Sequence, residues 1–459
     1  MRPAALLLPF VLCQVALSAA LPAWTARRTL DLGRAWAGHP VGFVFTVRNN
    51  QQYVGWYDAD RRMVFAQRSL DSARWTFHKT KEITGWDSHN YIALAFDRAG
   101  HLHVAANMHC SPLRYWRSEK PEDVSTLKPV HRMTGHESGC TYPQFFHDKT
   151  GRLLFMFRIG GSGSGRRYVN VYDEKARTWT RLISKPLLSG LEGGASMNSY
   201  PIGLRADRNG LFHIAWVWRD NPDCSTNHDL CYARSEDFKT WTSSSGKKLE
   251  LPITLKTAEI VAPVPARAGL ANFGGGLAFD QKDRPTITYT RFDRNGHNQI
   301  YAARLEEKGW QTYQLTDWKH RWNFRGGGCI RSEISWSALR PAGAKFLALN
   351  YRHPKAGSGM QRFDAETLKP VGALATVKSP WPDEVRRVRS KLPGMGVRMM
   401  PRRLQRPGEE PAVHILRWET LGVNRDRPRK KVPPPSKLQV IELVRQQQRP
   451  TQTDAAGSR

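Results

Sequence analysis

The sequence predicts an all-β protein, specifically a seven-bladed β-propeller, and three observations carry this prediction. An apolar stretch repeatedly leads into Asp-x-x-Gly, or a near match, and then into a second apolar stretch, with turn positions at Gly100, Gly151, Gly210 and Asp283. A further apolar stretch and a tryptophan, usually in Trp-Thr, close each unit. No helical periodicity of useful length competes. Repeated units of three or four short antiparallel strands are typical of propellers.

The units follow in order along the chain, and five of them are clear. Glycine suits the tight turn between two strands of a unit because it accepts a positive φ. In one such unit, apolar residues 93–96 lead through Asp97 and Gly100 into 103–105. We expect clear blades near 41–82, 88–132, 142–184, 200–255 and 272–316, followed by two weaker ones around 345–351 and 412–416.

The N-terminus has the pattern of a secretory signal peptide over residues 1–20. Arg2 is the basic start, residues 4–17 are apolar, and 18–20 form a small-residue cleavage signal. The apolar run is too short to span a membrane comfortably. We therefore expect a secreted or periplasmic protein without membrane insertion. Its catalytic propeller domain is expected at 21–446 and a disordered polar tail at 447–459.

The net charge of the chain indicates a polyanionic partner. The 459 residues hold 70 Lys and Arg against 40 Asp and Glu, a formal net charge of +30. Such a field attracts polyanions, and export argues against nucleic acid, so an acidic polysaccharide is the expected partner. Hydrophobic residues make up 40%, enough for a large core, which excludes global disorder. We expect the protein to be a monomer.

Four polar residues at strand ends are expected to converge on one face. His89 opens the first strand of one unit and His109 closes the second, so a hairpin returns both imidazoles to the same edge. Tyr142 and Arg158 have a similar spacing one unit later. The alternative interpretation is that all four are ordinary polar residues at strand ends.

Two histidines, a tyrosine and an arginine suit β-elimination on a uronic acid. The C5 proton of a uronate is only weakly acidic, and an arginine and a histidine beside the carboxylate stabilise the charge that develops on its removal. A second histidine or the tyrosine can take the proton, and the tyrosine can protonate the departing O4. No metal-activated water is needed, so these residue types favour a lyase.

Several segments resemble the BNR-4 repeat propellers, the family that includes the ulvan lyases and related rhamnosyl-glucuronate lyases. The resemblance covers roughly residues 40–370. Its matching segments are Asp87-Ser88-His89-Asn90, Asn107-Met108-His109, Thr141-Tyr142-Pro143 with Phe157-Arg158, Asn198-Ser199-Tyr200-Pro201, and residues 227–234. It implies β-elimination on a uronic-acid polysaccharide of the ulvan or rhamnosyl-glucuronate type. The catalytic residues it implies are His89, His109, Tyr142 and Arg158.

The resemblance also suggests roles for individual residues. Tyr142 is expected to be the acid and, for one sugar epimer, also the base. His89 is the alternative base, and His109 is expected to join Arg158 at the substrate carboxylate. The residues expected to contact substrate are Asn90, Asn107, Tyr200 and Arg166. Arg166 and Arg167 follow a Gly-rich run at 160–165, and the alternative for both is a solvated surface.

Two other functions stay open as alternatives. A non-catalytic glycan-binding propeller would fit the basic charge equally well. A sialidase-type glycoside hydrolase would need a carboxylate pair, or an arginine triad with a Tyr–Glu couple, and no persuasive set stands near Tyr142. The sequence does not choose which uronate is cleaved.

A cluster of soft ligands suggests a structural zinc ion. Cys224, His228 and Cys231 lie close together in the sequence, and with Cys329 they suit tetrahedral Zn²⁺. The resemblance implies a structural zinc as well. A Cys224–Cys231 disulfide and free thiols are the alternatives.

Two further cysteines lie close to the catalytic candidates. Cys110 and Cys140 either form a disulfide that braces the site or are inert buried thiols. With five cysteines after the signal peptide, not all can pair. The nearby run 160–165 follows a strand and precedes no helix, so we expect a hairpin tip rather than a phosphate-binding loop.

Overall fold

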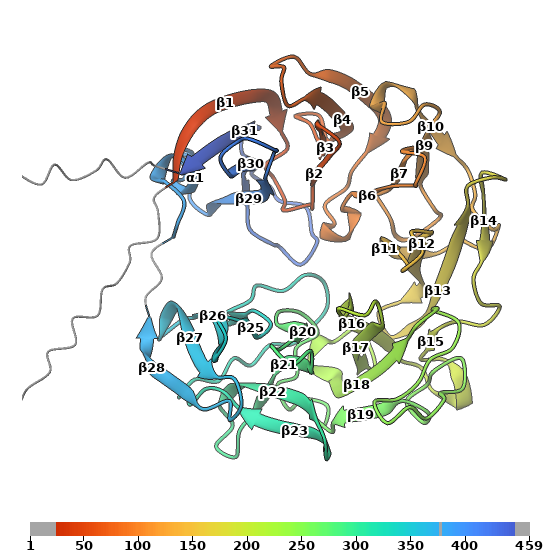
Figure 1. Cartoon of the computed structure of the whole chain (residues 1–459), viewed down its shortest axis with the longest axis vertical. Coiled ribbons are helices and arrows are strands. Elements are labelled where there is room, and N and C mark those ends of the chain that lie inside the picture. Colours follow the sequence, from red (N-terminus) through yellow and green to blue (C-terminus); the bar gives the residue numbers. More distant parts are fainter. Residues whose placement is uncertain (1–23, 376–378, 446–459) are drawn as a thin grey trace, which may run out of the picture.

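The computed structural model describes residues 24–375 and 379–445. The expected signal peptide at 1–20 and the expected tail at 447–459 lie outside these ranges. Within them the all-β prediction is confirmed, since the only α-helix is one short turn, α1 (Asp383–Arg386). The strands form seven antiparallel sheets, which Figure 1 shows arranged in a ring around a common centre. No helix in this part of the chain is long and apolar enough to cross a membrane.

The first four sheets come from the N-terminal half of the chain. The first contains β2 (Val44–Arg48), β3 (Gln51–Tyr57), β4 (Arg62–Ser69) and β5 (Thr76–Ile83). The second contains β6 (Ala93–Phe96), β7 (Leu102–Ala105), β9 (Tyr115–Ser118) and β10 (Leu127–Val130). The third contains β8 (His109–Ser111), β11 (Cys140–His147), β12 (Leu153–Gly161), β13 (Ser164–Asp173), β14 (Thr178–Arg181) and β15 (Leu188–Ser189). The fourth contains β16 (Asn198–Ala206), β17 (Phe212–Arg219), β18 (Asn227–Ser235) and β19 (Glu259–Ala262).

Three more sheets follow around the centre. The fifth contains β20 (Gly276–Phe279), β21 (Pro285–Phe292), β22 (Asn298–Glu306) and β23 (Gly309–Gln314). The sixth contains β24 (Ser335–Trp336), β25 (Arg340–Pro341), β26 (Phe346–His353), β27 (Gly357–Asp364) and β28 (Pro370–Ala375). The seventh contains β29 (Met395–Leu404), β30 (Ala412–Leu421), β31 (Ser436–Arg445) and β1 (Trp24–Ala35). The 3₁₀ turns are η1 (Ser88–Asn90), η2 (Val124–Thr126), η3 (Glu192–Gly194) and η4 (Cys224–Thr226).

The repeated aspartate turns share one geometry. Between β6 and β7, Asp97 Oδ1 accepts a hydrogen bond of 2.8 Å from the backbone N–H of His101, and Gly100 has a φ of +91°. A side-chain acceptor that binds a backbone donor four residues later closes the turn between two strands. The same bond, at 2.9–3.0 Å, recurs at Asp148, Asp207 and Asp280.

Strand β8 follows β7 of the second sheet in the chain but pairs with β11 of the third sheet. His109 lies opposite Thr141 of β11, and Thr141 lies opposite Arg158 of β12. The prediction that His109 closes the second strand of its own unit is therefore wrong, because β7 already ends at Ala105. The crossing places His109 in the same sheet as Tyr142 and Arg158.

The N-terminal strand completes the last sheet. Strand β1 pairs with β31 from Trp24↔Arg445 to Ala35↔Ser436, so the two ends of the described chain are joined by backbone hydrogen bonds. Leu30 and Leu32 of β1 are buried in the core. The sequence prediction, which began its first unit at residue 41, did not include this strand.

The hydrophobic core lies between neighbouring sheets. Phe43 stacks on Trp418 at 4.5 Å between ring centroids, which joins the first sheet to the seventh. Tyr200, Leu277 and Tyr289 share a cluster that joins the fourth sheet to the fifth. Clusters of this kind join each sheet to the next from the first to the sixth, and the seventh to the first, so the inner strands that carry the polar residues are held in place.

Candidate active site

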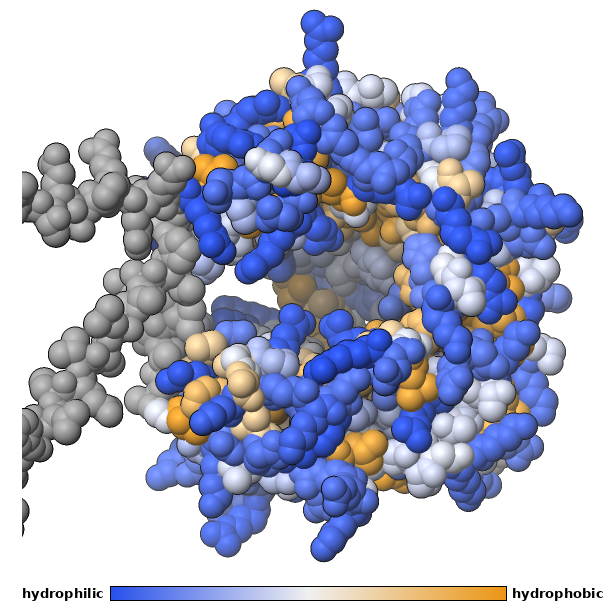
Figure 2. Space-filling view, viewed as in Figure 1, coloured by the Kyte–Doolittle hydropathy of each residue, from blue (hydrophilic) through white to orange (hydrophobic). Residues whose placement is uncertain are grey.

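A cavity of about 1460 Å³ lies at the centre of the ring, where Figure 2 shows a hollow between the sheets. Its wall takes residues from β2, β6, β8, β11, β13, β16, β17, β26, β29 and β30. Small-molecule pockets are typically ~300–1,000 Å³, so this cavity suits an extended ligand. Among the described residues that line it are six arginines and two histidines but no aspartate or glutamate.

Two histidines stand together on one side of the cavity. His89 lies in η1 and His109 begins β8, and their rings stack with centroids 4.1 Å apart. Asp87, the residue that caps η1, accepts hydrogen bonds from His89 Nδ1 at 2.6 Å and from His109 Nδ1. Because Asp87 engages Nδ1 of both rings, Nε2 is the nitrogen of each ring that is left for a ligand. The sequence singled out both histidines but gave no role to Asp87.

The charges of this trio are coupled. Burial lowers the pKa of His109, but its hydrogen bonds to Asp87 and Cys110 outweigh burial and raise that pKa to about 9. Burial raises the pKa of Asp87, and the two imidazoles reverse this and hold the pKa well below its ordinary value. At neutral pH the site therefore contains a carboxylate and a protonated His109.

Tyr142 enters the cavity from β11 next to the histidines. Its ring centroid lies 5.3 Å from that of His89, and its backbone φ is +58° at an irregularity in the pairing with β12. A positive φ is strained for a tyrosine and marks positions whose side chain is aimed by the surrounding structure. Burial and the neighbouring Tyr200 raise the pKa of Tyr142, while Arg158, Arg167 and Arg219 oppose the rise. The phenol is thus protonated at neutral pH.

Arg158 lies beneath Tyr142 rather than on the cavity wall. Its side chain is fully buried, with the guanidinium carbon 4.9 Å from the centre of the Tyr142 ring. Its Nη2 donates to Thr141 Oγ1 at 3.1 Å and to Cys110 Sγ at 3.4 Å. It is not among the residues that line the cavity. Arg158 can therefore act on a ligand only through Tyr142, Thr141 and Cys110.

The arginines that face the cavity on this side are Arg167 and Arg219. Arg167 is almost fully buried, and its guanidinium carbon lies 5.5 Å from the Tyr142 ring centre. Burial lowers the pKa of Arg167 to about 10. Its neighbour Arg166, the substrate contact expected from the sequence, points to Glu192 at 3.4 Å and does not line the cavity. Successive side chains of a strand point to opposite faces, which explains why the two arginines differ.

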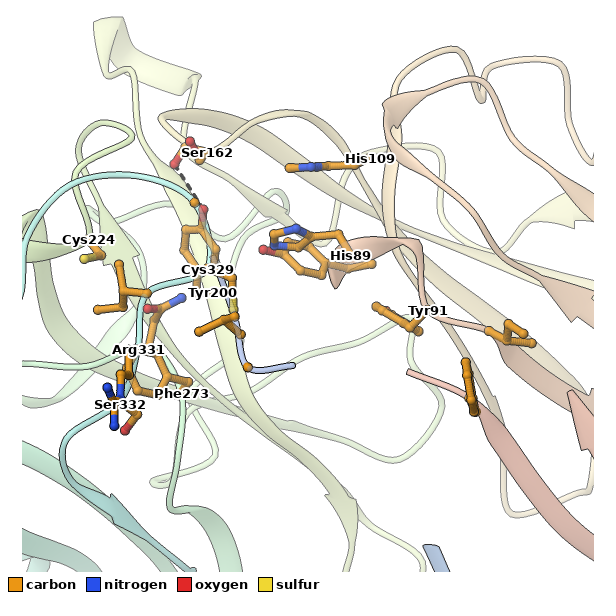
Figure 3. Close-up of a pocket in the computed structure, with 18 of the residues that line it drawn as sticks. His89, Tyr91, His109, Ser162, Tyr200, Cys224, Phe273, Cys329, Arg331 and Ser332 are labelled. Carbon is orange, nitrogen blue, oxygen red and sulfur yellow. Dashed lines mark hydrogen bonds between the residues drawn. The ribbon is translucent and has the colours of Figure 1, made fainter. Parts of the chain in front are cut away.

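The other predicted substrate contacts divide into two groups. Tyr200 of β16 lines the cavity, and its hydroxyl donates to the Ser162 carbonyl at 3.4 Å, as Figure 3 shows. Asn90 and Asn107 do not line it. Asn90 Nδ2 donates to Thr84, and Asn107 Nδ2 donates to Glu82 Oε2 at 2.9 Å. Both amides are used inside the protein, where they hold the loops that carry the histidines.

The residues predicted to bind zinc do not fit a zinc site. Cys231 is buried in a cluster with Trp216, whereas Cys224 belongs to a different cluster and lines the cavity, as Cys329 does. Both ring nitrogens of His228 lie about 3 Å from carboxylates. In the described residues, the group of three potential metal ligands that meets closely is instead Asp87, His89 and His109. No step of the chemistry is assigned to zinc.

The five cysteines of the described chain are all free. The alternatives of a Cys224–Cys231 or a Cys110–Cys140 disulfide are therefore wrong. Cys140 is fully buried, and burial raises the pKa of its thiol to about 12. Cys110 is exposed, and the hydrogen bond from His109 lowers its pKa to about 7, with Thr141 and Arg158 adding to this effect against burial.

Asp426, in the loop between β30 and β31, holds the segment that carries Ser88 and His89 from the other side. Its Oδ1 accepts from Ser88 N at 3.0 Å, from Ser88 Oγ at 2.8 Å and from His39 Nε2 at 3.2 Å. Its Oδ2 accepts from Cys329 N at 2.8 Å and lies 3.8 Å from His89 Nδ1. Nothing in the local sequence around Asp426 marks this role, because its partners are distant in the chain.

Comparison with known proteins identifies the family of the chain and solved structures with a similar fold. Residues 51–318 match the family model described as "BNR repeat-containing family member". The long ulvan lyase isoform of Glaciecola sp. (strain KUL10) is 28% identical over 151 residues, 30% of this chain and 14% of that protein. The short ulvan lyase isoform of Alteromonas sp. (strain LOR) is 36% identical over 66 residues, 14% of this chain and 12% of that protein. The chain thus aligns with only a small part of the length of these curated relatives.

Two solved structures resemble nearly the whole chain. The polysaccharide lyase Uly1 aligns with a TM-score of 0.61 at 14% identity, over 92% of this chain and 99% of its own. A PL25 ulvan lyase bound to -[GlcA(1-4)Rha3S]- aligns with a TM-score of 0.60 at 13% identity, over 91% and 96% of the two chains. At these identities the likeness shows a shared fold.

Proposed function

The chain belongs to the BNR repeat-containing family, and we propose that it is a secreted polysaccharide lyase that cleaves a uronic-acid polysaccharide of the ulvan type by β-elimination. In this proposal the seven sheets are the blades of a seven-bladed propeller with the active site at its centre. The observation that carries it is the cluster of His89, His109 and Tyr142 in one large cavity rich in arginine. The ulvan type is proposed because the relatives found are ulvan lyases.

The first requirement of β-elimination is to neutralise the uronate carboxylate. Arg167, Arg219 and the protonated His109 face the cavity and supply fixed positive charge for it. This charge counts most in the transition state, when the C5 carbanion delocalises onto the carboxylate. Arg158, expected from the sequence to do this directly, is proposed to position Tyr142 from beneath.

The second requirement is a base and an acid. His89 Nε2 removes the C5 proton, the electrons of the C5–H bond form the C4=C5 double bond, and the C4–O4 bond breaks. The protonated phenol of Tyr142 then gives its proton to O4, and the two side chains exchange the proton through water to restore the resting state. The raised pKa of Tyr142 keeps its phenol protonated at neutral pH, which is the state that the acid needs before transfer. For the C5 epimer, whose proton lies on the same side as O4, Tyr142 first gives its phenol proton to His89 through water, and its phenolate then removes the C5 proton and passes it to O4.

The hydrolase alternative receives no support from the cavity wall. A glycoside hydrolase of the usual kind needs two carboxylates about 5–10 Å apart, and the described lining residues include none. The non-catalytic alternative keeps the same residues but predicts binding without turnover.

The proposal is tested with purified protein and a panel of acidic polysaccharides that includes ulvan. The C4=C5 double bond conjugated to the carboxylate absorbs in the ultraviolet, whereas products of hydrolysis do not. Growth of this absorbance on a uronate polymer supports the proposal. New reducing ends without absorbance would indicate hydrolysis, and binding without either would indicate a glycan-binding protein.

A further inference from the structure

A second set of positive side chains lines the cavity away from the histidines. We call it the arginine wall: Arg331, Arg352, Arg398 and Arg429. Figure 3 shows Arg331 and Ser332 on the side of the pocket opposite His89 and His109. The arginine wall is thus separate from Arg167 and Arg219, which lie beside the tyrosines of the catalytic side.

The arginine wall carries charge that the protein itself does not neutralise. Within the described ranges none of its four residues forms a salt bridge, whereas Arg68, Arg304 and Arg417, which are buried away from the cavity, each pair with a glutamate. Positive charges gathered without counter-ions repel one another, and an anionic ligand relieves the repulsion. An unpaired arginine cluster in a cavity therefore indicates an anion site.

Two members of the arginine wall are held ready by the backbone. Arg352 Nη2 donates to the Ser332 carbonyl at 2.8 Å, and Arg429 Nη2 donates to the Gly422 carbonyl at 2.7 Å. Each guanidinium has five N–H donors, so most remain free for a ligand. Arg331 and Arg398 are exposed and make no side-chain hydrogen bond to the described protein. The wall thus combines two fixed guanidinium groups with two that can adapt.

The arginine wall lies outside the part of the chain that matches the family model. All four residues come from the sixth and seventh sheets and their loops, after residue 318, where the match to the family ends. The cavity, at about 1460 Å³, has room for more than one sugar. A chain that places its uronate at the histidines can therefore place a neighbouring sugar at the wall.

We infer that the arginine wall is a subsite for a second anionic group of the polysaccharide, a sulfate ester or a further carboxylate on a sugar near the cleaved bond. This inference rests on the proposed function for the identity of the polymer, but not for the presence of the anion site. Guanidinium groups recognise sulfate and carboxylate alike through paired charge-assisted hydrogen bonds.

The test removes Arg331 and Arg398 together, as Arg331→Gln/Arg398→Gln, because neither side chain supports the fold through a described bond. Arg403→Gln is the matched control: Arg403 is also exposed, lies on the same strand as Arg398 and does not line the cavity. Binding of ulvan fragments is measured by isothermal titration calorimetry in the Tyr142→Phe background, so that cleavage does not consume the ligand. Desulfated and carboxyl-reduced ulvan are measured in parallel.

The double variant is expected to bind intact ulvan about 10-fold more weakly, the low end for charge-assisted bonds at a solvated site, and Arg403→Gln to bind as the parent does. If the parent and the double variant bind desulfated ulvan equally, the anion is a sulfate ester. If they bind carboxyl-reduced ulvan equally, the anion is a carboxylate. Equal binding by double variant and parent, or equal weakening by the control, would overturn the subsite. If the double variant binds ulvan more weakly than its parent but the wild-type protein cleaves no polysaccharide, the subsite stands and the lyase proposal is refuted. If the wild-type protein cleaves and the double variant and its parent bind equally, the lyase proposal stands and the subsite is refuted.

Discussion

At the scale of single residues, the position of one carboxylate organises the site. Asp87 caps η1, and its two oxygens bind Nδ1 of His89 and of His109. A carboxylate shared by two imidazoles fixes both rings and keeps one of them charged. The two histidines that the sequence singled out therefore depend on a third residue that it treated only as part of a motif.

Asp87→Asn should retain the fold but lower the rate of cleavage by roughly 10- to 100-fold, as for other carboxylates that orient histidines. It should also change the pH profile. In the parent, His109 loses its charge as the pH rises through about 9, so kcat/KM falls there. Without Asp87 the pKa of His109 drops and the fall begins at lower pH. An alkaline limb that stays in place would contradict this role.

Cys110 should be the thiol that reacts first with iodoacetamide. Only the thiolate is nucleophilic, and the pKa of Cys110 is about 7, whereas burial raises that of Cys140 to about 12. The rate of alkylation should rise with a midpoint near pH 7 and disappear in Cys110→Ser. Mass spectrometry of the modified peptides identifies the site. Labelling of Cys329 or Cys224 ahead of Cys110 would contradict the prediction.

The direction in which a strand residue points depends on a register that the local sequence does not carry. Arg166 and Arg167 follow a Gly-rich hairpin tip, and the face to which each points depends on where the turn falls. The zinc prediction rested on closeness in sequence. Cys224 lies in η4 and Cys231 within β18, so closeness in sequence did not bring the sulfur atoms together.

At the scale of elements, the turns could be predicted from the sequence, but the pairing of a strand with the neighbouring sheet could not. The Asp-x-x-Gly pattern located four turns correctly because one side-chain bond closes each of them. A further copy at Asp58 escaped notice because Arg61, with a φ of +63°, stands where glycine was expected. The transfer of β8 to the third sheet had no local signal, yet it brings His109 to Tyr142.

The loop between β30 and β31 should stabilise the molecule through Asp426. Burial raises the pKa of this carboxyl, but bonds from His39, Ser88 and Cys329 bring it to about 2 in the folded protein. A folded pKa below the unfolded value gives stability that is present above about pH 4 and is lost as the pH falls through 2. Asp426→Asn should therefore lose about 2 kcal/mol of unfolding free energy at neutral pH.

Urea unfolding at pH 7 and at the lowest pH where the parent stays folded measures this difference. The difference in unfolding free energy between the parent and Asp426→Asn should become smaller as the pH falls. A difference that does not depend on pH would show that the charge of the carboxylate does not cause the stabilisation.

At the scale of the whole molecule, the chain closes on itself through β1. Leu32 of β1 is buried although its strand lies more than 400 residues from its partner β31. Leu32→Ala should cost about 2–4 kcal/mol of unfolding free energy. Thr29→Ala, at an exposed position of the same strand, should stay within about 0.5 kcal/mol. Denaturant unfolding compares the two, and equal costs would contradict a role for β1 in the core.

The sequence supported the all-β class and the units at 41–316 because each unit is local, with strands joined by short turns. It could not supply the closure by β1, since pairing between the two ends of a chain leaves no local pattern. It also located three residues of the cavity cluster, His89, His109 and Tyr142. The cavity arginines of the last two sheets were missed because those units had the weakest repeat signal.

The most direct test of the account is the removal of one hydroxyl. Tyr142→Phe keeps the ring over Arg158 and deletes only the proton donor to O4. Tyr168→Phe is the control, because Tyr168 does not line the cavity. Both are assayed by ultraviolet absorbance on the polysaccharide that the parent cleaves. The account predicts that Tyr142→Phe binds this polymer but loses cleavage by at least about 100-fold, while Tyr168→Phe cleaves as the parent does. Cleavage by Tyr142→Phe at the parent rate would contradict the account.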